Sequence, residues 1–198
     1  MSNRKITIDF YNENAKQFAE STAFVEFHDM QHSFLNKLPE EAYILDFGCG
    51  SGRDTKYFIE QGYRVEAIDG SAELCKLASE FTGTKVKHMY FHELNELKKY
   101  DGIWACSSIL HLPIEELEEV MEKMKEALKD EGIIYTSFKY GTFSGERNGR
   151  FFTDMTEDTF CELLKRVQGL FLEEQWVTSD VRPDRGEERW LNLILRKK

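Results

Sequence analysis

The sequence predicts an α/β fold with a mostly parallel sheet, and three observations lead to this prediction. Short apolar runs alternate with segments of helical periodicity along most of the chain, as expected for strand–helix–strand units. The first of these runs leads into a glycine-rich loop, DFGCGSG, at a place where α/β proteins commonly bind a ligand. Two strand-like runs follow one another near the end of the chain, which favours an antiparallel hairpin at the sheet edge.

The first elements are indicated by apolar spacing and by residues that end helices. Residues 1–38 are expected to form an N-terminal helical cap segment, because apolar side chains recur at helical spacing over 24–38 and Pro39 lies just beyond. Gly62 is placed to end a short helix at about 54–61. The other elements expected in this half are a buried strand at 42–47, a strand at 63–69, a helix at 71–81 and a strand at 85–91.

The second half repeats the alternation of strands and helices. Pro113 opens a helix with one apolar face, and Gly132 is expected to terminate it. Thr156 is expected to cap a second helix within MTEDTFCELLKRV. The strands expected in this half are 101–110, which enters a loop, 132–140, 172–177 and 189–198.

These elements predict a single domain over residues 1–198, with its core over 42–198. The seven expected strands would form one sheet, mostly parallel, with helices on both faces and an antiparallel hairpin at the edge. A three-layer sandwich is therefore the predicted architecture.

Composition narrows the class of protein. The net charge of −10 argues against broad binding to a nucleic acid backbone or to an anionic membrane. No apolar stretch approaches the roughly 20 residues of a membrane span, and the start of the chain lacks the apolar core of a signal peptide; we therefore expect a cytoplasmic protein. The cysteines lack the spacing of a zinc site, so we expect no metal and four buried free thiols, Cys49, Cys75, Cys106 and Cys161.

The glycine loop indicates the class of ligand. Glycines at 48, 50 and 52 let a ligand approach the main chain without Cβ atoms in the way. Their spacing is G-x-G-x-G, with Arg53 where a dinucleotide-binding G-x-G-x-x-G motif needs its last glycine, and the P-loop pattern is absent. Asp46 places a carboxylate beside the loop, which disfavours a bare phosphate. A cationic sulfonium nucleoside, with an ammonium group that needs acceptors, is the alternative.

A second acid follows the second expected strand. Asp69 ends this strand, and one carboxylate can accept hydrogen bonds from both vicinal hydroxyls of a ribose. NAD-binding folds use an acid in the same place, so Asp69 alone does not discriminate between cofactors. Asp69 could also stabilise the N-terminus of the next helix without any ligand.

Four segments carry a resemblance to a known family. In order, ILDFGCGSGRDT, VEAIDGSAEL, YDGIWACSSILHLP and LKDEGIIYTSFKYG resemble the class I S-adenosylmethionine-dependent methyltransferases, and most closely the small bacterial enzymes of the tellurite-resistance and ubiquinone-biosynthesis type. The resemblance runs from about Phe10 to the C-terminus. It implies a Rossmann-like fold, methyl transfer (EC 2.1.1.-) and S-adenosyl-L-methionine as the cofactor.

The resemblance also implies a cofactor site. The family's first motif surrounds the methionine part of the cofactor, and its acid after the second strand binds the ribose. The family often has an aspartate beside the adenine, which this chain lacks, and its aromatic-rich opening segment commonly closes over the cofactor. The matching positions are Asp46, Gly48, Gly50 and Gly52 with the neighbouring Cys49 and Arg53 for the first motif; Asp69, Gly70 and Ser71 for the ribose and adenosine; Met89, Tyr90 and Phe91 for the adenine; Cys106, Ser107 and His111 for the methionine end; and Tyr11 and Phe18 for the opening segment.

The chemistry implied is an in-line displacement, which depends mainly on alignment and exclusion of water. A base is needed only if the acceptor must lose a proton. His111 is the candidate base, although it could equally be a loop histidine that holds the turn before Pro113.

Two polar segments are candidates for acceptor recognition. Residues 138–156 are long, polar and rich in glycine, and either cover the acceptor pocket or form a solvated connection. Residues 182–190 are the second candidate, in which Trp190 could instead pack as an edge-strand aromatic. The side chains considered are Lys139, Tyr140, Arg147 and Arg150 in the first segment, and Arg185, Arg189 and Trp190 in the second.

The leading hypothesis is a methyltransferase that acts on a small-molecule acceptor, without a nucleic acid or membrane partner. An RNA- or protein-modifying methyltransferase is the second hypothesis, and the acidity of the chain counts against it. A non-catalytic nucleoside-cofactor-binding module or a nicotinamide-dependent oxidoreductase is the third, and the glycine spacing opposes the oxidoreductase. The identity of the acceptor and the oligomeric state cannot be read from the sequence.

Overall fold

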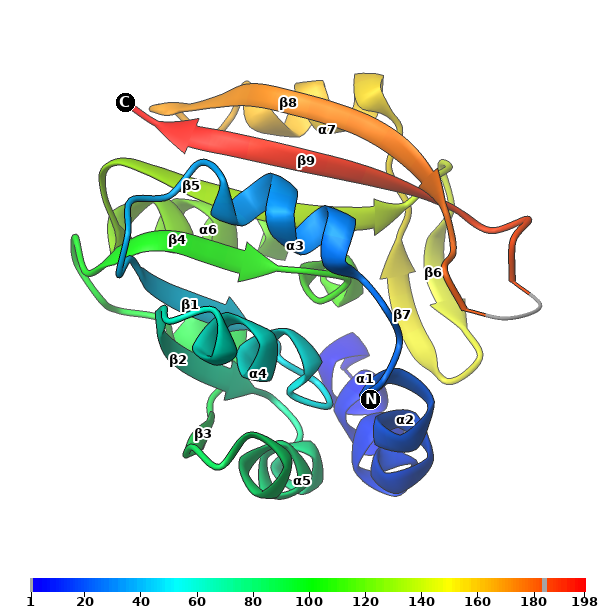
Figure 1. Ribbon diagram of the computed structural model, residues 1–198. Coiled ribbons are helices and arrows are strands. Elements are labelled where there is room, and N and C mark those ends of the chain that lie inside the picture. Colours follow the sequence, from blue (N-terminus) through cyan, green and yellow to red (C-terminus); the bar gives the residue numbers. More distant parts are fainter. Residues whose placement is uncertain (1, 183–184) are drawn as a thin grey trace.

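A single seven-stranded sheet forms the middle of the molecule (Figure 1). The computed structural model describes residues 2–182 and 185–198. The strand order is β3-β2-β1-β4-β5-β9-β8, and β9 is antiparallel to both of its neighbours while the other pairs are parallel. The predicted seven-stranded, mostly parallel sheet is confirmed. Its strands are β1 (Tyr43–Phe47), β2 (Arg64–Asp69), β3 (Val86–His88), β4 (Tyr100–Ala105), β5 (Leu128–Lys139), β8 (Leu170–Ser179) and β9 (Arg189–Lys197).

Helices cover both faces of this sheet, which completes the three layers (Figure 1). Helices α3 and α4 lie in front of the sheet in this view, and α6 and α7 lie behind it. The N-terminal helices α1 and α2 lie beyond the ends of the strands, beside α5 and β7. The helices are α1 (Asn3–Glu13), α2 (Ala15–Thr22), α3 (His28–Leu35), α4 (Arg53–Glu60), α5 (Ala72–Thr82), α6 (Ile114–Ala127) and α7 (Glu157–Leu164), with short 3-10 turns η1 (Phe91–Glu93) and η2 (Ile109–His111).

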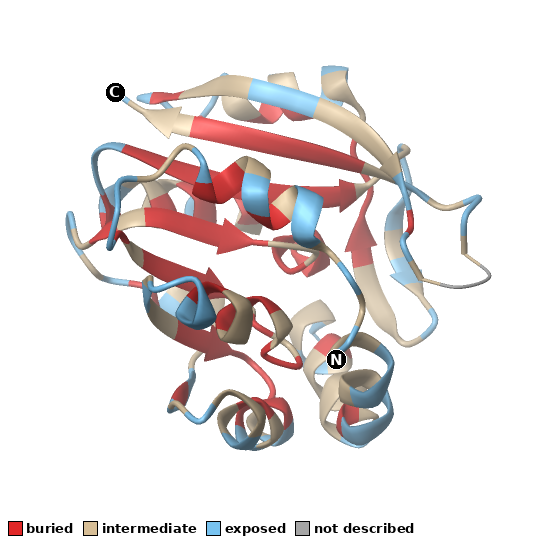
Figure 2. Ribbon diagram, viewed as in Figure 1, coloured by how far each residue is buried: buried red, intermediate tan, exposed pale blue. Residues whose placement is uncertain are grey.

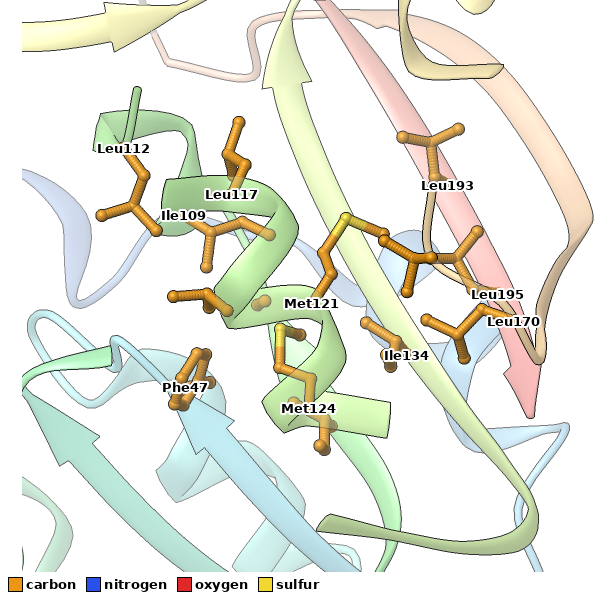
Figure 3. Packing of buried hydrophobic residues seen from close by; sticks show 14 of the residues in the cluster. Phe47, Ile109, Leu112, Leu117, Met121, Met124, Ile134, Leu170, Leu193 and Leu195 are labelled. Atoms are coloured by element: carbon orange, nitrogen blue, oxygen red, sulfur yellow. The ribbon is translucent and has the colours of Figure 1, made fainter. Parts of the chain in front are cut away.

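The apolar stripes of the helices account for this packing. The strands in the middle of the sheet are buried, whereas β8 at its edge is mostly intermediate or exposed and the outer helix faces are exposed (Figure 2). Met121 and Met124 of α6 point into the cluster formed with the sheet, near Ile134 of β5 (Figure 3). On the opposite face, Phe34 of α3 and Phe58 of α4 pack around the fully buried Trp104. Burying one such large side chain contributes about 1.5–3 kcal/mol.

Several predicted boundaries are wrong. Helix α6 ends at Ala127, and Gly132 lies inside β5 instead of terminating the helix. The strand begins early because Leu128 already pairs with Tyr100, after which the register shifts and Glu131 takes a positive φ of 64°. The segment 24–38 yields only α3, and the strand expected at 85–91 is three residues long.

The polar segment after β5 forms a hairpin. Strands β6 (Ser144–Arg147) and β7 (Arg150–Thr153) pair antiparallel. Asn148 and Gly149 between them have positive φ values of 53° and 72°, and this dipeptide favours such a tight turn. The hairpin projects beside the carboxyl ends of the central strands (Figure 1).

The strand order reverses between β1 and β4, which each continue toward opposite edges of the sheet. Open α/β sheets bind ligands just outside the carboxyl ends of the strands at such a reversal. Within the described residues, no helix combines the length and apolar character that a membrane crossing requires.

Candidate functional site

A deep cleft opens at the carboxyl ends of the central strands. Its space, including the part open to solvent, is about 1770 Å³. The glycine loop after β1 forms its floor, while α1, α2 and the β6–β7 hairpin contribute the opposite side. The predicted site residues that line it are Tyr11, Phe18, Gly48, Cys49, Gly50, Arg53, Asp69, Gly70, Tyr90, Phe91, Cys106, Ser107, His111, Lys139, Arg150 and Arg185.

Besides Arg147 and Arg189, which are described below, five predicted site residues do not line the cleft. Asp46 is buried and accepts a hydrogen bond from the Thr55 hydroxyl at 2.5 Å. Burial, together with the nearby charge of Asp54, raises the pKa of Asp46, and the contact with Thr55 connects β1 to α4. The other four are Gly52, Ser71, Met89 and Tyr140.

These residues have other contacts. A Cβ on Gly52 would lie 2.7 Å from the Thr82 side chain, so this glycine allows α4 and α5 to pack closely. The Ser71 side chain accepts a hydrogen bond from the Leu74 amide and caps α5. Met89 packs against the main hydrophobic cluster, and the Tyr140 hydroxyl donates to Glu157 at 2.9 Å.

The glycine loop leaves no space for side chains at two positions. Gly48 has a φ of +90°, and a Cβ there would lie 2.6 Å from the Cβ of Ser108. Gly50 has a φ of +56°, and its Cβ would lie 3.1 Å from the ring of Phe18 on α2. Glycine is therefore required both by the backbone conformation and by the close approach of α2.

Asp69 connects the end of β2 to this loop. Its Oδ2 accepts the Gly50 amide at 2.9 Å and its Oδ1 accepts the Ser71 amide at 2.8 Å. Each carboxylate oxygen can accept a further hydrogen bond, so the side chain can hold the loop and still bind a diol. Burial raises the pKa of Asp69, and the two amide contacts oppose this shift. The N-cap of the following helix is Ser71 rather than Asp69.

The wall next to Asp69 is largely apolar and aromatic. Ile8, Leu74, Tyr90 and Phe91 line it. A Cβ on Gly70 would lie 2.7 Å from the Ile8 side chain, which brings α1 close to the end of β2. A slot of this kind suits a flat, uncharged ring. Ile8 and Leu74 were not predicted from the sequence, because nothing in the local pattern separates them from ordinary packing residues.

A buried ionic network lies at the floor of the cleft. The Arg53 guanidinium donates twice to Asp54, at 2.8 and 2.9 Å. Trp104 and Gln31 also donate to this carboxylate, at 2.9 and 2.7 Å. Burial raises the pKa of Asp54, but the Arg53 charge and these hydrogen bonds outweigh it and the net pKa is lowered. Asp54 and its two further donors were missed from the sequence.

His111 lies at the centre of a second group that joins three segments. Its Nδ1 lies 2.7 Å from the Phe151 carbonyl and its Nε2 lies 2.9 Å from the Tyr11 hydroxyl. A carbonyl can only accept, so Nδ1 carries the proton and Nε2 accepts from Tyr11. Arg150 donates to the same hydroxyl at 3.4 Å. Burial lowers the pKa of His111 to about 4, against the bond to Phe151, so the imidazole is neutral at pH 7.

Neutral burial of His111 predicts acid-sensitive stability. Its pKa is about 4 in the folded protein and about 6.5 in the unfolded chain. Between these values the unfolded chain binds the extra proton. Stability is therefore complete above pH 6.5, and about 3 kcal/mol is lost as the pH falls to 4. Urea unfolding of the wild type and of His111→Gln at several pH values should show a smaller acid-induced loss in the variant. If the free energy of unfolding fell equally with decreasing pH in both proteins, a neutral buried His111 would be contradicted.

Ion pairs crowd the end of the cleft nearest β5, β8 and β9. Lys139 and Arg185 both contact Glu188, and Arg182 pairs with Asp180 at 2.5 Å. Asp180 and Arg182 also line the cleft; Arg182 begins the predicted segment 182–190, whereas Asp180 lies outside it. Of the predicted segment 182–190, residues 183 and 184 lie outside the described residues.

The remaining candidates from the two polar segments divide between the cleft and the surface. Trp190 lines the cleft, and its indole donates to Asp180 at 3.1 Å. Arg147 pairs with Asp154 at 2.9 Å and does not line the cleft. Arg189 lies over the Tyr140 ring at 4.8 Å and is also outside the lining.

Comparison with known proteins finds similar sequences that are named as methyltransferases. Residues 44–132 match a family model described as a methyltransferase domain. A protein of Staphylococcus carnosus named as an uncharacterized methyltransferase is 26% identical over 156 residues, 74% of this chain and 73% of the relative. The N-terminal Xaa-Pro-Lys N-methyltransferase 2 of Danio rerio is 33% identical over 129 residues, 56% of this chain and 46% of the relative.

A similar solved structure covers nearly the whole chain. It is the 1,6-didemethyltoxoflavin-N1-methyltransferase of Burkholderia thailandensis, crystallised with 1,6-didemethyltoxoflavin and S-adenosylhomocysteine. The TM-score is 0.76 at 23% identity, over 98% of this chain and 87% of the other. This likeness extends the agreement from residues 44–132 to the overall fold.

Proposed function

We propose that the chain is a class I S-adenosylmethionine-dependent methyltransferase and that it methylates a small-molecule acceptor bound in the cleft beside the cofactor. The family comparison carries the methyltransferase assignment. One observation supports a small acceptor: the cleft is covered by the N-terminal helices α1 and α2 and by the β6–β7 hairpin, and the hairpin is in contact with α1. Phe18 of α2 lies against Gly50, and the Phe151 amide of the hairpin donates to Thr7 of α1 at 3.0 Å.

The residues of the cleft fit S-adenosylmethionine. The Asp69 carboxylate retains acceptor capacity for the ribose hydroxyls, and the apolar wall beside it suits the adenine ring. Bare main chain at Gly48 and Gly50 can approach the methionine part without a side chain in between. Arg53 is already neutralised by Asp54, so the floor does not carry the unpaired cation that a pyrophosphate site would favour.

In methyl transfer the protein mainly has to align the reacting groups and exclude water. When bound, S-adenosylmethionine supplies an activated methyl group for in-line displacement. Tyr11 and Phe18, whose rings meet edge to face at 5.1 Å, cover the loop and exclude water. For an acceptor that carries a proton on its nucleophile, Tyr11 and His111 provide a route: the Tyr11 oxygen takes that proton as its own moves to Nε2 of His111.

A macromolecular acceptor is the competing function. The Danio rerio relative is by its name a protein N-terminal methyltransferase, and this favours a protein substrate as the second candidate. Entry of a polypeptide into the cleft would have to pass between α1 and the hairpin, which are joined by the Thr7–Phe151 contact. An RNA acceptor is opposed by the net charge of −10.

Two measurements test the proposed function. S-adenosylhomocysteine at about 100 times its dissociation constant should stabilise the protein by about 2.7 kcal/mol, whereas NAD at the same concentration should not shift the melting temperature. Incubation with S-adenosylmethionine labelled on its methyl group should then label the metabolite fraction of a cell extract. Label confined to the protein or RNA fraction would reject a small acceptor, and absence of the thermal shift would reject the cofactor.

A further inference from the structure

Arg150 is a cation of the cleft with unused hydrogen-bonding capacity. It begins β7 and lines the cleft beside Tyr11. Its Nη1 donates to the Tyr11 hydroxyl at 3.4 Å, which is its one hydrogen bond within the described part of the chain. Its Nε atom is buried and has no partner. The Nε–Nη2 edge of the guanidinium is therefore left without an acceptor among residues 2–182 and 185–198.

The other cations that line the cleft are all paired with carboxylates. Each has an acidic partner within ion-pair distance, whereas no described carboxylate pairs with Arg150. Pairing lowers the net charge that a cation offers to a ligand. Lys139 and Arg185 share the single carboxylate of Glu188, whereas Arg150 is the lining cation that has no carboxylate partner at all among the described residues. The pairs are Arg4–Glu116, Arg53–Asp54, Lys139–Glu188, Arg182–Asp180 and Arg185–Glu188.

The β6–β7 hairpin contains a second arginine, Arg147, that can be compared directly with Arg150. Arg147 lies directly opposite Arg150 in the β6–β7 register. Arg147 is outside the cleft and is neutralised by Asp154, whereas Arg150 is inside the cleft and is not. Since a buried donor without an acceptor is costly, the unpaired Nε–H of Arg150 is expected to be satisfied by a bound group.

Aromatic rings hold the Arg150 guanidinium without supplying an acceptor in its plane. Its central carbon lies 4.5 Å from the Phe10 ring, 5.2 Å from Phe152 and 5.7 Å from Tyr11. Such contacts stabilise the cation and restrict its orientation. They leave the in-plane N–H groups available for the two oxygens of a carboxylate, whose geometry matches this edge.

We propose that the methyl acceptor is an organic acid whose carboxylate is bound by the Nε–Nη2 edge of Arg150. This inference deepens the proposed function and rests on it. Phe152, whose ring lies 5.2 Å from the Arg150 guanidinium, also lines the cleft, so the acid carries an apolar body that packs against this ring. The carboxylate then fixes the acceptor at the hairpin and leaves its nucleophilic atom to face the cofactor.

The experiment compares an acid with its uncharged counterpart. Protein saturated with S-adenosylhomocysteine is titrated with benzoate and with benzamide, and binding is followed by calorimetry or ligand-observed NMR. The wild type should bind benzoate at least about tenfold more tightly than benzamide, the usual advantage of a charge-assisted contact. Arg150→Gln should lose this preference, Arg150→Lys should recover only part of it, and Arg147→Gln should retain it.

The order of the measurements distinguishes failure of the proposed carboxylate site from failure of the proposed methyltransferase function. S-adenosylhomocysteine binding is measured first, and its absence in the wild type rejects the methyltransferase cleft itself. With that binding intact, equal affinity for benzoate and benzamide overturns the carboxylate assignment. An equal loss in Arg147→Gln and Arg150→Gln overturns it too, as does inorganic phosphate that displaces benzoate and binds more tightly. Thermal unfolding of each variant confirms that the comparison is made on folded protein.

Discussion

Replacing Asp54 with alanine should lower the free energy of unfolding by about 3–5 kcal/mol, the cost of breaking a buried ion pair. The carboxylate accepts two hydrogen bonds from Arg53 and one each from Trp104 and Gln31. Its removal leaves the Arg53 charge in the protein interior with no acid in its place. For a domain of this size the melting temperature should fall by roughly 6–20 °C.

Two control variants isolate the cause of this loss. Asp54→Asn keeps the shape and two hydrogen-bonding atoms but removes the charge, so it should be destabilised through the unpaired Arg53. Asp130→Ala removes an acid whose partner, Lys98, is equally exposed, and stability should not change measurably. Thermal and urea unfolding of the three variants are the measurements. Equal melting temperatures for Asp54→Ala and Asp130→Ala would show that the network is not a source of stability.

The order of the elements could be predicted because the signals for it are local. The glycine loop, the apolar run before it and the acid after the next strand lie within 44–69. Gly62 ends α4 and Thr156 caps α7 as expected. The alternation of strand and helix patterns then implies a parallel sheet, since parallel neighbours need a crossover connection.

The contacts of the site could not be predicted, because they join residues far apart in the chain. Asp54 meets Trp104 and Gln31 across separations of 50 and 23 residues, and no local pattern records such a meeting. Asp46 matched a family motif, yet its burial behind the loop depends on how α4 packs. The β6–β7 hairpin did have a local signal, because the Asn148–Gly149 dipeptide favours such a turn, but the expectation for residues 138–156 was a pocket cover or a solvated connection.

The error in the predicted C-terminus of α6 has a similar explanation. Gly132 is the kind of residue that follows a helix, and the residues between Ala127 and Gly132 are polar apart from Leu128. Pairing of Leu128 with Tyr100 of β4 draws this stretch into the sheet, and the register shift accommodates it. A tertiary contact with another strand thus overrides a local stop signal.

Replacing Asp69 with alanine should weaken binding of S-adenosylhomocysteine by about 10–150-fold, or about 1.5–3 kcal/mol. Two losses add up. The variant lacks the carboxylate proposed to accept the ribose hydroxyls, and it also frees the Gly50 and Ser71 amides that this carboxylate holds at 2.9 and 2.8 Å. The loop that we propose lies beneath the cofactor therefore loses its connection to β2. Calorimetric titration of the wild type and the variant gives the two dissociation constants.

The buried acid Asp46 provides the matched control for Asp69. Both acids lie at or next to the C-terminal ends of neighbouring strands, but Asp69 lines the cleft and Asp46 does not. Asp46→Asn keeps the size of the carboxyl and its hydrogen-bonding atoms, and burial already disfavours the charged form of Asp46, so the affinity of this variant for S-adenosylhomocysteine should stay within about threefold of the wild type. An unchanged dissociation constant in Asp69→Ala would remove this residue from the cofactor site. A loss in Asp46→Asn as large as that in Asp69→Ala would instead show that any disturbance of the loop weakens binding, so that direct contact with the ribose would no longer be needed to explain the effect.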